Sequence, residues 1–271
     1  MPMIEGTDGF TVAREKFLLI GILGQTYSGQ STFFNSVMEE QHFGVMDHRG
    51  KFEDIVLSYL DGEPSIVEWY NEAHQNGAEL PRREGDVVLY DEPGITAYIF
   101  SEEYLKDKEK MHLISQHSFN KKVTRIARDL ENIANNQPNI TKDMQVPLFV
   151  DFPMCAGLNY YDYVDHMIII KRPTDPDINS WYVKYMCADH DPNTDNWIDL
   201  CVPDNKEKLL LASDDREFSE IVLDPAKTTI IENFGTVDEY VEKIEIVLKE
   251  FRDRSQQVLA EKINRFSKEI I

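Results

Sequence analysis

The sequence has 271 residues and a formal net charge of −21, because 49 acidic residues outnumber 28 Lys and Arg. This charge disfavours a broad groove for nucleic acid and disfavours binding to an anionic membrane. No apolar run reaches the roughly 18 residues of a membrane span, and the first residues are too polar for a secretory signal. The cysteines (Cys155, Cys187, Cys201) lack metal-ligand spacing, so the composition predicts a soluble cytoplasmic protein.

The charge is unevenly distributed along the chain. Residues 106–128 contain seven Lys and Arg against two acids, whereas residues 175–224 contain 13 acids against four bases. We expect a phosphate ligand to bind near the first segment, although a solvated helical face is an equal explanation of it. The second segment would steer a basic protein partner toward itself.

Apolar runs alternate with helical periodicities along the chain. Residues 17–24, FLLIGILG, form a branched apolar run that ends in glycine, which predicts a buried parallel strand. Four more strands are expected, at 43–47, 146–153, 166–173 and 228–236. Helical patterns occupy 31–40, 52–77, 102–136 and the residues after Thr236, while 76–86 looks like a loop. This alternation predicts an α/β fold with a parallel, doubly wound sheet of about five strands.

A helix start signal follows the last of these strands. Thr236 and Glu239 have the T-x-x-E spacing of a capping box. Apolar residues from Val237 to Phe251 then recur on one helical stripe. The pattern therefore predicts an amphipathic helix that begins next to Thr236.

The stretch from Gly24 to Thr32, GQTYSGQST, has the glycine spacing of a phosphate-binding loop. Between a strand and a helix, such glycines let backbone N–H groups surround phosphate oxygens. Ser31 stands where a hydroxyl that holds Mg²⁺ belongs, but Gln30 occupies the position of the lysine. Losing a well-placed donor in the transition state costs about 10²–10³ in rate. The alternative is a glycine turn that binds no ligand.

In the order of its motifs, the chain resembles dephospho-CoA kinase and, more loosely, the phage deoxynucleoside monophosphate kinases. The resemblance runs from about Phe17 to Phe251. It rests on the glycine loop, the strand ending at Asp47, the helical segment around His117, VPLFVD at 146–151 and IIENFGT at 230–236. It implies a P-loop kinase fold with ATP and Mg²⁺ as cofactors.

The resemblance also implies roles for individual residues. The nucleotide-binding set would be Gly24, Ser28, Gly29, Gln30, Ser31, Thr32, Asn233 and Gly235, with the last two near the adenine. Asp47 would be the base, and Ser31 and Asp151 would hold Mg²⁺. On the acceptor side, His117 matches a family histidine, although packing within a helix is an equal explanation. Lys121 and Arg125 are the other acceptor-side residues, and the basic segment 106–128 that contains them is the expected second anchor.

Several departures from the family point away from catalysis. Gln30 replaces the lysine, Arg49 aligns with the second aspartate of the family motif, and the acceptor-side arginines before Tyr98 are absent. The lid region, residues 174–200, contains Lys184 as its only Lys or Arg, and an acidic lid repels a triphosphate. If only one of these charges were missing, Arg49 or Lys171 could supply a positive charge in its place.

The sequence thus predicts a degenerate relative of dephospho-CoA kinase, a pseudokinase that binds a nucleotide or CoA-like ligand, or keeps only the shape, and acts through protein contacts. The alternative is an active ATP-dependent phosphotransferase with dephospho-CoA or a deoxynucleoside monophosphate as acceptor. A nucleic-acid mimic, suggested by the charge alone, is a third hypothesis.

The predicted organisation places one kinase-like domain between two terminal segments. Its parts are a tail at 1–16, the domain at 17–251 with a helical acceptor-side insertion at 78–140 and an acidic lid-like insertion at 173–226, and a helical extension at 252–271. Within the acidic insertion, Asp189, Asp191, Asn193 and Asp195 have the spacing of a calcium loop. Thr194 stands where that loop needs glycine, so a solvated acidic loop is favoured.

Overall fold

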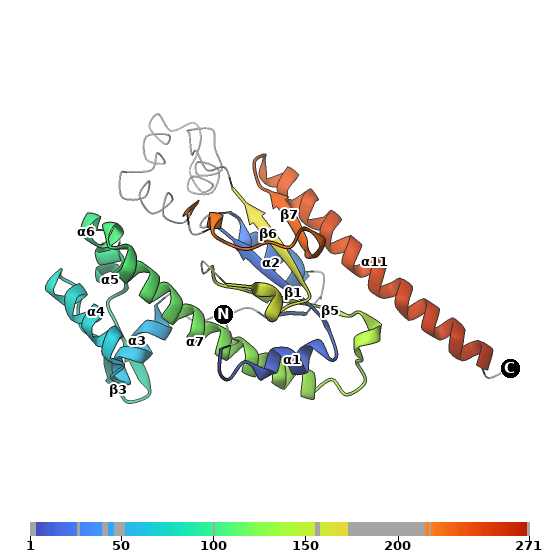
Figure 1. Ribbon diagram of the computed structural model, residues 1–271, viewed down its shortest axis with the longest axis horizontal. Coiled ribbons are helices and arrows are strands. Elements are labelled where there is room, and N and C mark those ends of the chain that lie inside the picture. The colour runs from blue at the N-terminus through green and yellow to red at the C-terminus, as the bar shows by residue number, and fades with distance from the viewer. Residues whose placement is uncertain are drawn as a thin grey trace.

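The computed structural model places one parallel sheet at the centre of the molecule (Figure 1). It describes residues 4–25, 28–39, 43–45, 52–99, 101–154, 158–172, 215–216 and 218–269. The strands of the sheet are β1 (Leu18–Gly24), β2 (Phe43–Val45), β5 (Pro147–Asp151), β6 (His166–Lys171) and β7 (Thr228–Glu232). All neighbouring pairs are parallel, in the order β2-β5-β1-β6-β7. The α/β class and the five strands expected from the sequence are confirmed.

Helices cover both faces of the sheet. Strand β1 is buried from Leu18 to Leu23, and its side chains alternate between two cores. Leu19 and Leu23 pack with α1 (Asp8–Arg14) and α7 (Lys108–Asn135), while Ile20 and Ile22 pack with α2 (Gln30–Glu39) and α11 (Val237–Glu269). A continuous apolar run is what a central strand between two helical layers requires.

The N-terminal residues, which the sequence analysis assigned to a tail, contain helix α1. Phe10 and Ala13 of α1 are fully buried against α7. A Cβ atom on Gly9 would lie 1.8 Å from the carbonyl oxygen of Ala127, so only glycine allows the two helices to approach this closely. The tail therefore belongs to the core of the molecule.

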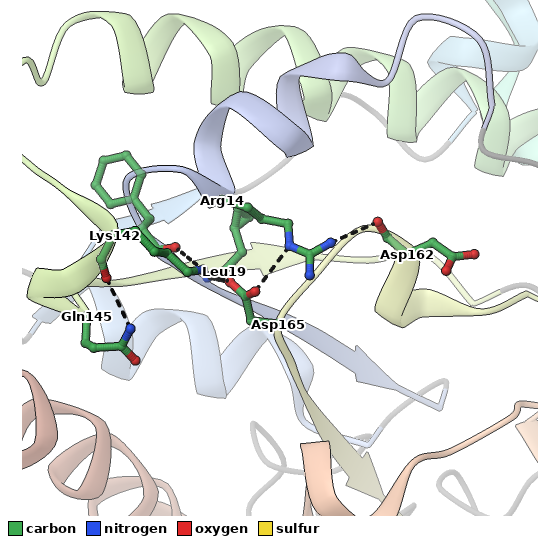
Figure 2. A network of polar contacts seen from close by, with 7 residues as sticks. Arg14, Leu19, Lys142, Gln145, Asp162 and Asp165 are labelled. Atoms are coloured by element: carbon green, nitrogen blue, oxygen red, sulfur yellow. Dashed lines mark hydrogen bonds and ion pairs between the residues drawn. The ribbon is translucent and has the colours of Figure 1, made fainter.

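A polar cluster joins this helix to the amino ends of the central strands (Figure 2). Asp165, just before β6, accepts hydrogen bonds from the backbone N–H of Leu19 at 3.0 Å and from Lys142 Nζ at 2.6 Å. Arg14 Nε donates to the same carboxylate at 3.2 Å, and its NH1 donates to the carbonyl of Asp162. The cluster holds together the amino ends of β1 and β6, whereas the glycine loop follows the carboxyl end of β1.

The residues between β2 and α7 form a separate group of small elements, drawn away from the sheet in Figure 1. Below, the insertion means this group, from α3 to α6, and not the segment 78–140 predicted from the sequence. They are α3 (Glu53–Leu60), α4 (Pro64–Gln75), the hairpin β3 (Arg82–Glu84) and β4 (Val87–Leu89), α5 (Glu92–Ile99) and α6 (Glu102–Lys106). The helical pattern expected over 52–77 forms two helices, α3 and α4, which are separated at Gly62, whose φ of 78° leaves the helical region. The loop expected at 76–86 contains strand β3, so that prediction was wrong. Short 3₁₀ turns at Lys142–Met144, Tyr160–Asp162 and Pro225–Lys227 complete the connections.

The capping box at the start of α11 is confirmed. The backbone N–H of Glu239 donates to Thr236 Oγ1 at 3.2 Å, and the backbone N–H of Thr236 donates to Glu239 Oε2 at 2.6 Å. Helix α11 then continues without interruption to Glu269 and extends past the sheet in Figure 1. The segment 252–271, predicted as an extension, is part of this same helix as far as Glu269. In the described part of the chain, no helix combines the length and apolar character needed to cross a membrane.

Candidate functional site

The order of the strands creates a crevice at the carboxyl ends of β1 and β6. In the strand order, the connection from β1 leads toward β2 at one edge of the sheet, and the connection from β6 leads toward β7 at the opposite edge. Open α/β sheets bind ligands where neighbouring strands have such opposite connections. Gly24 and Lys171 end the two strands, so the glycine loop borders this crevice.

The described residues of the loop show why glycine is needed at two positions. A Cβ atom on Gly24 would lie 2.3 Å from Ser28 Oγ, so the loop folds directly over the end of β1. Gly29 has a φ of 95°, a conformation that favours glycine, and it leads into α2 at Gln30. The Ser28 hydroxyl is buried and has no hydrogen-bond partner among the described residues. A buried, unpartnered hydroxyl inside a glycine turn is available to a ligand.

Two residues after β7 hold the backbone of the loop. Asn233 is fully buried, and its Nδ2 donates to the carbonyl of Ser28 at 2.7 Å. The Tyr240 hydroxyl donates to the carbonyl of Gly29 at 2.9 Å. Asn233, which the sequence analysis placed near an adenine, therefore positions the loop. Gly235 leaves room for the Glu239 carboxylate of the capping box, because a Cβ atom there would lie 2.0 Å from Glu239 Oε2.

Gln30 and an unexpected lysine share one carboxylate. Gln30 Nε2 donates to Asp151 Oδ1 at 2.5 Å and to the carbonyl of Ile22 at 3.2 Å. Lys122 Nζ, from α7, donates to Asp151 Oδ2 at 2.8 Å, and the side chains of Lys122 and Asp151 are each 20% exposed. Both oxygens of Asp151 thus have a donor. An ammonium group on this carboxylate does not fit the expected role of Asp151 as a ligand of Mg²⁺.

A second polar cluster lies on the other side of the loop. Gln25, directly after β1, donates to Asp215 Oδ1 at 2.6 Å, and Arg172 NH2 lies 2.8 Å from the same oxygen. Burial raises the pKa of Asp215, and Arg172 and Gln25 act against this shift. The cluster borders a hollow of about 640 Å³ whose apolar lining includes Phe218 and Phe234. Ligand pockets of roughly 300–1,000 Å³ with few polar groups are typical of small-molecule sites.

The three residues expected on the acceptor side contact α3 and Glu63, the residue just before α4. His117 Nε2 lies 2.7 Å from Ser58 Oγ, and its Nδ1 lies 3.1 Å from Glu63 Oε1. Lys121 Nζ lies 3.6 Å from Glu63 Oε2, and Arg125 pairs with Asp54. These contacts favour the packing interpretation of His117. Lys121 and Arg125 border an open groove of about 700 Å³ between α1, α3 and α7.

Several expected residues lie outside the described part of the chain. They include the candidate base Asp47, Arg49, and the acidic residues 173–214 with their calcium-like spacing. Ser31 is exposed in the first turn of α2, and Thr32 beside it is half-buried. Among the described residues, no group of three or more His, Cys, Asp or Glu side chains could hold a metal ion.

The sequence analysis included Lys122 in the basic segment without singling it out, and it did not identify Arg172 or Asp215. Lys122 belongs to the basic segment, but successive residues of a helix point about 100° apart. The sequence does not define which of these neighbouring side chains faces the glycine loop. Asp215 is one acid among many in its segment, and nothing in the sequence pairs it with Arg172.

Comparisons with known proteins add little to this geometry. No family model matches the chain, and no curated protein matches it. Among solved structures, the chain is similar to TT1252 from Thermus thermophilus, with 13% identity and a TM-score of 0.39. The match covers 87% of this chain and 98% of that chain. No activity follows from these comparisons.

Proposed function

We propose that this chain is a P-loop kinase-fold protein, related to dephospho-CoA kinase, that binds the phosphates of a nucleotide or CoA-like ligand but has lost phosphoryl transfer. The observation that carries the proposal is the engagement of Gln30 with Asp151. At the lysine position, a neutral amide is directed to the carboxylate at the end of β5 and supplies no charge to a phosphoryl group.

The glycine loop supports the binding half of the proposal. It joins a buried strand to a helix at the switch point of the sheet, where backbone N–H groups at the start of α2 favour an anion. Ser28 and Gly29 would border the phosphates, since one has a buried unpartnered hydroxyl and the other has the positive φ of a tight turn. The hollow beside Gln25 and Phe234 has room for the rest of the ligand.

The environment of Asp151 supports the loss of transfer. Phosphoryl transfer depends on cations that neutralise charge on the moving group, and an acid that orients Mg²⁺ is one of the usual parts. Here that acid is occupied by Gln30 and Lys122. We further propose that the protein acts through protein contacts at its acidic segment, most of which lies outside the described residues.

An active ATP-dependent kinase is the second candidate, and one observation favours it. The ammonium of Lys122 lies next to the residue at the lysine position, so the charge missing from Gln30 is present one side chain away. Dephospho-CoA and deoxynucleoside monophosphates are the acceptors to test.

A thermal titration combined with an assay separates these readings. ATP with Mg²⁺ at 100 times its dissociation constant should add about 2.7 kcal/mol of stability, while dephospho-CoA and deoxynucleoside monophosphates gain no phosphate. Turnover that disappears in Gly29→Ala would overturn the first proposal in favour of the second. No shift with any nucleotide or CoA derivative would reject ligand binding altogether.

A matched pair of glycine variants shows whether the shift comes from this loop. Gly29→Ala should abolish it, because an alanine at φ 95° distorts the turn. Gly62→Ala is the control, since Gly62 has a φ of 78° at the break between α3 and α4, and a Cβ atom there meets nothing within 4 Å. Both variants strain the backbone, and Gly62→Ala should keep the shift.

A further inference from the structure

The loop at the carboxyl end of β1 lacks its own cation, yet a cation lies beside it. Lys122 projects from the middle of α7 and contacts Asp151, whose other oxygen accepts from Gln30. Three side chains from α2, β5 and α7 therefore meet at the start of α2. The two donors on one carboxylate place the ammonium next to the position that a loop lysine would fill.

The pairing with Asp151 leaves the ammonium able to bind a second anion. A lysine ammonium has three N–H donors, and the carboxylate uses one of them through Asp151 Oδ2. The Lys122 side chain is 20% exposed, so it is held in place without being sealed from solvent. A phosphate oxygen over the first turn of α2 can then accept from Lys122 while Asp151 keeps its bond.

The buried hydroxyl in the loop is an independent sign of a ligand at this place. Ser28 is 1% exposed, and its Oγ has no partner among the described residues. Buried hydroxyl groups in folded proteins are nearly always hydrogen-bonded. An anion at the loop would provide the acceptor for this donor.

We infer that Lys122 supplies, from α7, the cation that binds the phosphate chain of the ligand in place of the loop lysine. The inference rests on the proposed phosphate-binding function. It assigns the anchor to a different residue from the expected Lys121 and Arg125, which pair with acids of the insertion. The ligand class is a di- or triphosphate, because one ammonium and one helix start together suit an extended chain of phosphates.

The test uses the full chain and inorganic tripolyphosphate, followed by calorimetry and by the shift in melting temperature. Lys122→Gln should weaken binding by about 10-fold or more, since hydrogen bonds to charged groups contribute about 1.5–3 kcal/mol. Lys110→Gln is the matched control, because Lys110 lies on the same helix, is 26% exposed and pairs with Glu72. It should bind like the wild type.

A charge relocation makes the test specific to this site. In the double variant Lys122→Gln with Gln30→Lys, the cation returns to the loop, and binding should recover to within a few-fold of the wild type. Lys122→Gln binding as tightly as Lys110→Gln would overturn the inference. Absence of tripolyphosphate and nucleotide binding in the wild type would instead reject the proposed function. Should Lys122→Gln fail to fold, Lys122→Met removes the same charge while keeping an unbranched side chain, and binding as tight as in Lys110→Gln would again overturn the inference.

Discussion

Two buried tyrosines in the insertion differ in one hydrogen bond, and that difference is testable at the scale of single residues. The hydroxyl of Tyr70 is buried with no partner among the described residues, and burial raises its pKa. Tyr98 packs in the same core, but its hydroxyl donates to Glu72 Oε2 at 2.9 Å. A buried hydroxyl without a partner lowers stability, whereas a paired one does not.

We therefore expect Tyr70→Phe to leave the free energy of unfolding unchanged or to raise it by up to about 1 kcal/mol. Tyr98→Phe, the matched control, should lower it by about 1 kcal/mol because Glu72 loses a donor. Urea denaturation of both variants measures the difference. Equal losses in the two would mean that the Tyr70 hydroxyl is satisfied after all.

At the same scale, the sequence predicted the ends of elements better than it predicted partners. Gln30 and Asp151 follow directly from the positions of a helix start and a strand end, and parallel strands bring such ends to one edge. Lys122 could not be chosen over Lys121, because one residue along a helix turns the side chain by about 100°. The roles predicted for Gly24 and Gly29 depended on their spacing between an expected strand and an expected helix, and the backbone at both positions is compatible with them.

At the scale of elements, His117 joins three helices. Its Nδ1 lies beside Glu63, before α4, and its Nε2 beside Ser58 of α3, while His117 itself belongs to α7. Glu63 accepts only and Ser58 can donate, so the neutral ring that donates from Nδ1 and accepts at Nε2 satisfies both. Burial lowers the pKa of His117, and the Glu63 carboxylate acts against this shift.

This arrangement predicts a pH dependence of stability. The folded His117 binds its proton less readily than the unfolded one, whose pKa is about 6.5. Its contribution is therefore present above about pH 6.5 and lost as pH falls toward the folded value. In His117→Gln, the fall in unfolding free energy between pH 7 and pH 5 should be smaller than in the wild type. His166, whose pKa is also lowered by burial and by Arg254, should account for part of the remaining slope.

Urea titrations at several pH values check this expectation. His112, on the same helix and exposed, provides the control for the loss of a histidine, as His112→Gln. A slope that is unchanged in His117→Gln would show that the folded and unfolded states bind the proton of His117 equally, so that burial does not lower its pKa.

The elements that sequence reasoning found and missed differ in burial. Strands β1, β5 and β6 are apolar runs buried between layers, so the sequence pattern identified them. Strands β3 and β4 are short and largely exposed, with Arg82, Arg83 and Glu84 all exposed, so no hydrophobic pattern marked them. Helix α1 has too few residues for a clear periodicity, and its burial comes from Gly9 allowing close contact with α7.

At the scale of the whole molecule, α7 belongs to two hydrophobic cores. Its C-terminal part, including Val123 and Leu130, packs under the sheet, while Ile114 packs with the insertion. The insertion core contains an aromatic group, with Trp69 in edge contact with Tyr98 and Tyr104. Lys122 lies in the part of α7 that packs under the sheet, between Phe119 and Val123, and the same helix continues to Ile114 in the insertion core.

Because the insertion has a hydrophobic core of its own, we expect it to lose structure before the sheet does. Trp69→Ala removes a large buried side chain and should cost the insertion about 3–5 kcal/mol. In hydrogen exchange, amides of α4 and α5 should then exchange much faster, while those of β1, β5 and β6 keep most of their protection. Phe149→Ala, in the sheet, is the comparison and should reduce protection throughout. If Trp69→Ala reduced the protection of the strand amides as much as that of α4 and α5, the two cores would unfold as one cooperative unit through α7. A mutation in the insertion would then also destabilise the structure around Lys122.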